Sequence, residues 1–135
     1  MPETETINAH RVGQLLAENG YDVSEPRPNV WRIREVDSGV AAQAVLEGEI
    51  LFLSLNCTVV PSKSITPELM RKMLAGDNGI STSHFQLYDV GEGNVAIALS
   101  NFCKLQNIGA EDEDDILSCV HFLLADVVEA RRLIS

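Results

Sequence analysis

Three segments of the chain carry hydrophobic residues at every third or fourth position, the spacing that places them on one face of an α-helix. The first covers residues 7–19 and is followed by Gly20, which suits the left-handed conformation that ends a helix. The second follows Thr66, a suitable N-cap, and begins with Pro67, whose missing N–H costs nothing there. The third follows the acidic residues 111–115, whose carboxylates favour the positive end of a helix dipole. Its predicted hydrophobic face is formed by Ile116, Leu117, Val120, Leu123, Leu124, Val127, Val128 and Ile134.

Five further segments alternate between hydrophobic and polar residues or are hydrophobic nearly throughout, as β-strands are. The most hydrophobic of them places Leu51, Leu53 and Leu55 on one face and Ile50 and Phe52 on the other. We therefore expect this strand to be central in a sheet and covered on both sides. The predicted strands cover residues 30–36, 40–46, 50–60, 85–90 and 95–105.

Together these elements predict one α+β domain in the order α-β-β-β-α-β-β-α, with a largely antiparallel sheet packed by helices. Between the first helix and the first strand, Pro26 and Pro28 rule out a continuing helix, and no strand is predicted there. A chain of 135 residues is long enough to bury roughly two thirds of its unfolded surface. Residues 1–6 are polar and contain a proline, so we expect a loose N-terminal tail followed by a single domain over residues 7–135.

The chain is strongly acidic, with 20 Asp and Glu residues against 10 Lys and Arg residues and a formal net charge of −10. A nucleic-acid partner is not expected, because binding needs cationic side chains that replace counterions on the phosphates. An anionic membrane would repel the protein for the same reason. Two interpretations of the charge stay open: it keeps copies of the protein apart in solution, or it attracts a partner that carries positive charge.

The three cysteines, Cys57, Cys103 and Cys119, are an odd number and have no CxxC spacing. The chain opens Met-Pro-Glu-Thr-Glu, without the features of a signal segment, and no hydrophobic stretch reaches the roughly 18 residues of a membrane helix. We therefore predict a cytoplasmic protein of bacterial type, whose cysteines are small buried residues in a reducing compartment. Cys57 and Cys103 lie in hydrophobic strands, where a thiolate is disfavoured.

Residues 91–96 match the dinucleotide-binding pattern GxGxxG/A. That pattern holds a pyrophosphate only where a helix begins at the loop, because the amides and the dipole of the helix bind the phosphates. Here the following residues alternate with a period of two, which indicates a strand. We interpret the glycines as a hairpin turn and expect no cofactor.

No other motif predicts a catalytic or metal site. Cys119 and His121 are two positions apart on a predicted helix and project about 200° from each other. The acidic residues 111–115 lack the alternating oxygen ligands and central glycine of an EF-hand loop. Residues 81–84 place hydroxyl groups beside a histidine, but sequence neighbours rarely form a catalytic triad. We predict that the protein is not an enzyme and has no catalytic, cofactor-binding or metal-binding residue.

Two hydrophobic residues of the last helix lie away from its predicted buried face. Phe122 and Leu133 share that side with small and polar residues, although a helix that packs on a single core keeps its other side polar. They are either isolated exposed side chains or contacts with a second subunit or a partner. Met70 and Met73 raise the same alternatives, because methionine serves both as core filling and on adaptable binding surfaces.

The order of the elements, the small size and the low isoelectric point resemble the type III secretion chaperone-like fold, which includes the YbjN-like bacterial proteins. The second half of the chain carries the resemblance most clearly. There a hydrophobic strand is followed by the short helical segment 68–74, the segment 83–87 with its glycine hairpin, the strand 95–105 and a long C-terminal helix.

The resemblance implies a non-catalytic homodimer that binds a protein partner, with the middle helix and an adjacent strand at the dimer contact. On this chain the contact would include Leu69, Met70, Met73 and Leu74. We expect a protein-binding module, chaperone-like or regulatory, whose partner the residues do not identify. The alternatives are a dedicated type III secretion chaperone for an effector, and a small-molecule binder or small enzyme of unknown type.

Overall fold

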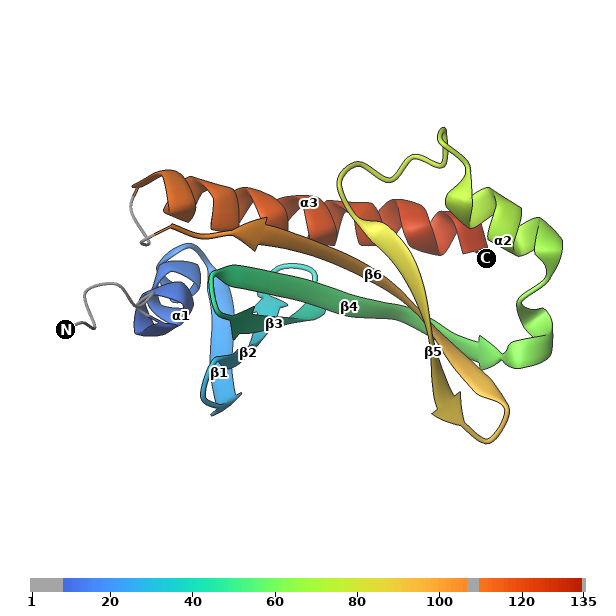
Figure 1. The fold of residues 1–135 in the computed structure, drawn as a ribbon, viewed down its shortest axis with the longest axis horizontal. Coiled ribbons are helices and arrows are strands. Elements are labelled where there is room, and N and C mark those ends of the chain that lie inside the picture. Colours follow the sequence, from blue (N-terminus) through green and yellow to red (C-terminus); the bar gives the residue numbers. More distant parts are fainter. Residues whose placement is uncertain (1–8, 107–109, 135) are drawn as a thin grey trace.

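The computed structural model describes residues 9–106 and 110–134, and in these ranges helices cover one face of a six-stranded antiparallel sheet (Figure 1). The strand order is β1-β2-β3-β4-β6-β5. The strands are β1 (Tyr21–Arg27), β2 (Val30–Glu35), β3 (Ala41–Glu47), β4 (Ile50–Pro61), β5 (His84–Gly91) and β6 (Asn94–Lys104). The helices are α1 (Ala9–Glu18), the short 3-10 helix η2 (Ser62–Ser64), α2 (Pro67–Leu74) and α3 (Ala110–Ile134).

The hydrophobic core lies between the sheet and the helices. Helix α3 runs along β6 and β4, α1 lies beside the first turns of α3, and α2 lies at the other end of α3 (Figure 1). An ion pair of 2.9 Å between Arg11 and Glu113 joins α1 to α3. The largest side chains that are almost completely buried come from all of these layers: Leu16, Trp31, Ile33, Leu51, Leu53, Ile97, Leu99, Leu105, Ile116 and Leu123.

The predicted fold class is confirmed, with one strand more than the predicted order contains. The observed order is α-β-β-β-β-α-β-β-α, because residues 21–27 form the edge strand β1. Its pairing with β2 is interrupted between Ser24 and Arg27, and Pro26 lies in this irregular stretch. An edge strand with such a bulge tolerates proline, since no ladder hydrogen bond is lost there. The prolines therefore exclude a helix in this segment but do not exclude a strand.

The prediction that the most hydrophobic strand is covered on both sides is wrong. Strand β4 is central, between β3 and β6, and Leu51, Leu53 and Leu55 are buried beneath the helices. On its other face Ile50 is half-buried and Phe52 is 41% exposed. Hydrophobicity on both faces of a strand therefore does not mean here that both faces are buried.

The predicted helix ends are partly confirmed. Thr66 caps α2 by accepting a hydrogen bond of 3.1 Å from the amide of Leu69, and Gly20 ends α1 with φ of 92°. The acidic residues 111–115 do not precede α3 but lie in its first turns, since the helix begins at Ala110. Residues 7 and 8 of the predicted first helix and the predicted tail 1–6 lie outside the described residues.

Other predictions from the sequence are met. The glycine-rich residues 91–94 form a hairpin between β5 and β6, with positive φ at Gly91, Glu92 and Gly93. Cys57 and Cys103 are buried and Cys119 is half-buried. Val128 differs from its prediction, since it is 55% exposed rather than part of the buried face of α3.

Candidate functional site

The face of the sheet that α1 and α3 do not cover, here called the open face, carries a row of hydrophobic side chains. Register pairs Val30 with Val45, Val45 with Phe52, and Phe52 with Phe102, so the four side chains follow one another across β2, β3, β4 and β6. We call them the apolar row. Val30 is buried and Val45 is half-buried, whereas Phe52 and Phe102 are 41% and 54% exposed. The two phenylalanine rings contact each other, with centroids 6.4 Å apart.

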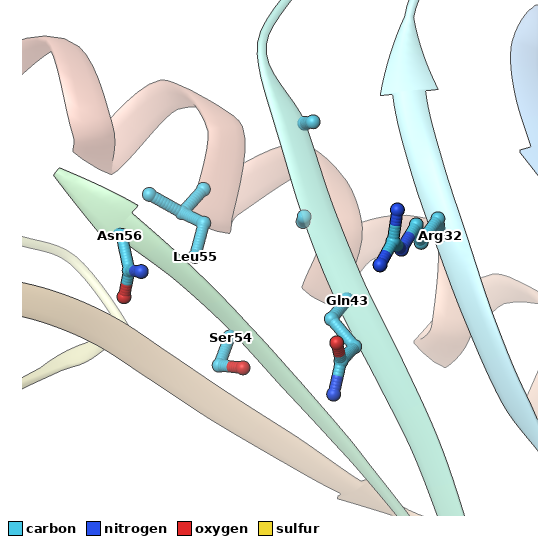
Figure 2. A pocket seen from close by; sticks show the side chains of 7 residues that line it. Arg32, Gln43, Ser54, Leu55 and Asn56 are labelled. Carbon is cyan, nitrogen blue, oxygen red and sulfur yellow. The ribbon is translucent and has the colours of Figure 1, made fainter. Parts of the chain in front are cut away.

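A second row on the open face is polar and crosses all six strands. Each member is the register partner of the next, and side chains opposite each other on adjacent strands lie in contact range. Figure 2 shows Arg32, Gln43 and Ser54 of this row together with Asn56, in front of the sheet and with a helix behind it. They line a shallow hollow of about 510 Å³. The polar row consists of Ser24, Arg32, Gln43, Ser54, Ser100 and His84.

Small residues on β6 lower the floor of the open face beside the apolar row. Ala98 lies between Asn56 and Gln86 in the register, and Ala96 is the partner of Tyr88. Both alanines are only 1% exposed, because larger neighbours rise on either side of them. A second hollow of about 410 Å³ lies on the open face between β4, β6 and β5. Its lining includes Tyr88, His84 and both phenylalanines of the apolar row. The open face is therefore a shallow, partly hydrophobic trough.

The open face does not share the chain's excess of negative charge. Its paired positions carry the cations Arg32, Arg34 and Lys104 and the carboxylates Asp22 and Glu47. Arg34 and Asp22 form an exposed ion pair of 2.7 Å. Arg32 has no carboxylate within ion-pair distance among the described residues. A hydrophobic or anionic segment could approach this face without the repulsion that the net charge of −10 implies.

The residues predicted as a partner or dimer interface lie on α2 and α3, not on the open face. On α2, Leu74 is 77% exposed and Met70 is 36% exposed, whereas Leu69 is half-buried and Met73 is only 4% exposed. Met73 is thus placed as core filling.

On α3, Phe122 is 42% exposed and its ring contacts that of His121. Leu133 is half-buried and lines a hollow of about 370 Å³ together with Lys72 of α2. Leu133 lies eleven positions after Phe122, about 16 Å along the helix axis. The structure therefore brings Leu133 close to α2 but places Phe122 elsewhere.

The apolar row was not predicted as a site, although the sequence held a signal for it. Strand 50–60 carries hydrophobic residues on both of its faces, and Phe102 stands at an even position of a strand whose large aliphatic residues, Val95, Ile97 and Leu99, stand at odd positions. Such residues have no place in a single core. The pattern within one strand does not show that Phe52 and Phe102 are register partners.

In the described part of the chain, no group of three His, Cys, Asp or Glu side chains is placed to hold a metal ion. No helix among the described residues is long and apolar enough to span a membrane.

Comparison with known proteins gives matches only at the level of structure. No protein-family model matches the sequence, and no curated protein matches it. The solved structure of YbjN from E. coli, a protein proposed to regulate transcription, aligns with a TM-score of 0.61 and 13% identity, over 93% of this chain and 87% of that one. A chain of the ExsC–ExsE complex aligns with a TM-score of 0.61 and 18% identity, over 95% and 96% of the two chains. At these identities the likeness establishes the fold, and this chain has the YbjN-like, type III secretion chaperone-like fold that the element pattern predicted.

Proposed function

We propose that this protein is a non-catalytic protein-binding module, chaperone-like or regulatory, that acts as a homodimer and holds a hydrophobic segment of a partner protein on its open face. The observation that carries this proposal is the exposed contact pair of Phe52 and Phe102 on a sheet face that no described element covers. Hydrophobic groups gathered in this way on a soluble domain are typical of interaction surfaces. The acidic remainder of the surface would keep the complex in solution.

The size of the effect follows from the exposed area of the two rings. Full burial of a phenylalanine contributes about 1.5–3 kcal/mol, and both rings are already about half buried. Covering the remaining half contributes roughly 1 kcal/mol for each ring. Loss of both rings should therefore weaken the binding of a partner by about 2 kcal/mol, which raises its Kd about 30-fold.

Two other functions are alternatives to this proposal. A dedicated type III secretion chaperone is favoured by the likeness to a chain of the ExsC–ExsE complex, in which two different proteins associate. A small-molecule binder or a small enzyme of unknown type would use the hollow beside Arg32, whose lining mixes polar and apolar residues. That hollow is wide open to solvent, unlike the enclosed pockets in which most small ligands are bound.

The binding test compares a double variant of the apolar row with a matched control. Phe52→Ser with Phe102→Ser removes the exposed rings, and Val36→Ser with Val128→Ser removes two hydrophobic side chains that are each 55% exposed elsewhere. The probe is reduced insulin, whose B chain aggregates and scatters light. We expect the wild type and the valine control to suppress scattering and the phenylalanine variant to lose most of this effect. Equal suppression by all three proteins, or none by any, would refute the role of the open face.

The same proteins, immobilised and exposed to a lysate of the native host, test for a specific partner. A protein retained by the wild type and by the valine control but not by the phenylalanine variant would support the proposal. Its identity would separate an effector from a regulatory partner. If a saturable small ligand binds instead and Arg32→Ala abolishes its binding, the third alternative replaces the proposal.

The dimer is tested separately, by light scattering coupled to size exclusion. We expect a mass of twice 14.8 kDa, and we expect Leu74→Ser in α2 to lower the fraction of dimer more than the control Val36→Ser does. Leu74 is chosen because it is 77% exposed, so its loss should not disturb the core. A single 14.8 kDa species at high concentration would overturn the homodimer.

A further inference from the structure

Two of the three cysteines meet between the sheet and α3. Cys103 lies on β6, with its side chain among the buried residues that face the helices, and Cys119 lies on α3. A hydrogen-bond interaction between the two thiols shifts the pKa of each of them. The Cys119 thiol also donates a hydrogen bond of 3.7 Å to the backbone carbonyl of Phe102. The sulfur of Cys119 on α3 thus lies against β6, at the residue that precedes Cys103.

The surroundings make the two thiols unequal. The hydrogen bond from the Cys103 thiol stabilises a thiolate on Cys119 and lowers the pKa of Cys119, against the opposing effects of burial and of Asp115. The same hydrogen bond, together with burial and the carboxylates of Asp115 and Asp112, raises the pKa of Cys103. Cys119 is also the more accessible of the two. The first sulfur to react with a reagent in solution is therefore that of Cys119.

The third cysteine provides a comparison within the same molecule. Cys57 is buried on β4, and burial raises its pKa to about 11. Arg131 acts on Cys57 electrostatically and opposes this rise in pKa. Arg131 lies twelve positions after Cys119, about 18 Å further along α3. Cys57 therefore takes no part in the contact between the other two thiols.

We propose that Cys103 and Cys119 form a redox site, in which a peroxide converts the two thiols into an intramolecular disulfide. The Cys119 thiolate attacks one oxygen of hydrogen peroxide, the O–O bond breaks, and the products are a sulfenic acid on Cys119 and water once the leaving hydroxide takes a proton. The sulfur of Cys103 then attacks the sulfenic sulfur. The S–S bond forms, the S–O bond breaks, and the thiol proton of Cys103 leaves with the hydroxide as a second water. In balance, two thiols and one peroxide give one disulfide and two waters.

The proposed disulfide would join α3 to β6 directly behind Phe102, whose ring belongs to the open face. It would close a loop over residues 103–119 and remove conformations from the unfolded chain. This inference does not depend on the proposed function, because it concerns the helix-covered side of the sheet and a covalent reaction of the chain itself.

Trypsin separates the three cysteines, which makes the test direct. Cleavage after Arg34, Lys63, Lys72, Lys104 and Arg131 leaves Cys57 in residues 35–63, Cys103 in residues 73–104 and Cys119 in residues 105–131. The folded protein is treated with hydrogen peroxide, alkylated, digested without reductant and analysed by mass spectrometry. We expect residues 73–104 to be linked to residues 105–131 with the loss of two hydrogen atoms, and the link to disappear after reduction. Residues 35–63 should carry an unoxidised Cys57.

Three variants distinguish the proposed order of reaction from chance oxidation. In Cys103→Ser a hydroxyl still offers a hydrogen bond to Cys119, but the sulfenic acid on Cys119 has no thiol to condense with, so dimedone should label Cys119. In Cys119→Ala no sulfenic acid should be trapped on Cys103 under the same conditions, whereas Cys57→Ala should form the disulfide as the wild type does. A midpoint of thermal unfolding that rises on oxidation in the wild type and in Cys57→Ala, but not in the Cys103 or the Cys119 variant, would show that the link is compatible with the native fold.

Other results would overturn the proposal. These are a disulfide only between two copies of the chain, seen as a doubled mass on a non-reducing gel; oxidation of Cys57 as fast as that of Cys119; or conversion of Cys119 to a sulfonic acid with no link to Cys103. Each of them leaves the binding test of the open face unaffected.

Discussion

Replacing the buried Asp126 should destabilise this protein more than replacing any solvent-exposed carboxylate of α3. The side chain is buried in the helix and accepts hydrogen bonds from a segment 45 residues earlier in the chain, just before β5. The amide and the hydroxyl of Ser81 donate to it at 2.9 Å, and the amide of Ser83 donates at 3.3 Å. One carboxylate thus anchors the connection that leads from α2 to the edge strand of the sheet.

The magnitude can be worked out from these three donors. A hydrogen bond to a charged group contributes about 1.5–3 kcal/mol, and a buried donor left without a partner costs about 1–3 kcal/mol. Ser81 is partly accessible, so water can replace some of its bonds in Asp126→Ala, whereas the buried amide of Ser83 has no such substitute. We expect a loss of about 2–4 kcal/mol in the free energy of unfolding. For a domain of this length that corresponds to a fall of roughly 5–15 °C in Tm.

The assay is urea unfolding followed by the fluorescence of Trp31, which is the single tryptophan of the chain and is 1% exposed. Asp114→Ala is the matched control, because it removes the same group from an exposed position of the same helix. In a chain with a net charge of −10 the control also relieves repulsion between carboxylates, so we expect its free energy of unfolding to change by no more than about 1 kcal/mol. If Asp126→Ala unfolds within about 0.5 kcal/mol of the control, the anchoring role inferred from its hydrogen bonds is wrong.

Two further outcomes follow from the packing. Gly13→Ala should destabilise the protein by about 1–3 kcal/mol, although alanine is the better helix former, because the added Cβ would lie 3.0 Å from Nε1 of the buried Trp31; a gain in the urea midpoint would contradict this. Burial raises the pKa of Cys57 from 9.0 to about 11, so the folded state keeps a proton that the unfolded state releases, and this contribution to stability is complete below pH 9 and is lost as the pH rises toward 11. Iodoacetamide should therefore alkylate Cys57 in the native protein only near or above that pH, and rapid labelling of residues 35–63 at pH 8 would show that the thiol is accessible as a thiolate.

Local patterns predicted most elements of this fold because the forces behind them act within a few residues. The cap at Thr66, the left-handed Gly20 and the alternation in β2 depend on neighbours that the sequence displays directly. Strand β1 was not predicted, because a proline such as Pro26 is tolerated only at an irregular part of an edge strand. Whether residues 21–27 lie at an edge depends on where the other strands pair, and no local pattern contains that.

The candidate site was less predictable than the fold. The residues inferred from helix patterns and from the family resemblance lie on α2 and α3, and among them Met73 is buried whereas Leu74 is the most exposed. The open face is not predicted, because hydrophobic residues on both faces of β4 suggest that both faces are buried. A strand cannot show by itself whether a second layer covers it.

The sequence by itself determined the fold class, because periodicities of two and of about 3.6 residues separate strands from helices and place one hydrophobic face on each. It also determined the acidic character of the surface, which is a sum over residues and needs no coordinates. Only the tertiary structure decided that Phe52 lies beside Phe102 and that Cys119 of α3 lies beside Cys103 of β6. Both are contacts between separate elements, and they depend on strand register and on how α3 packs against the sheet. Those two quantities are set by the whole core at once, since a shift of one residue in register would turn every side chain of a strand to its other face.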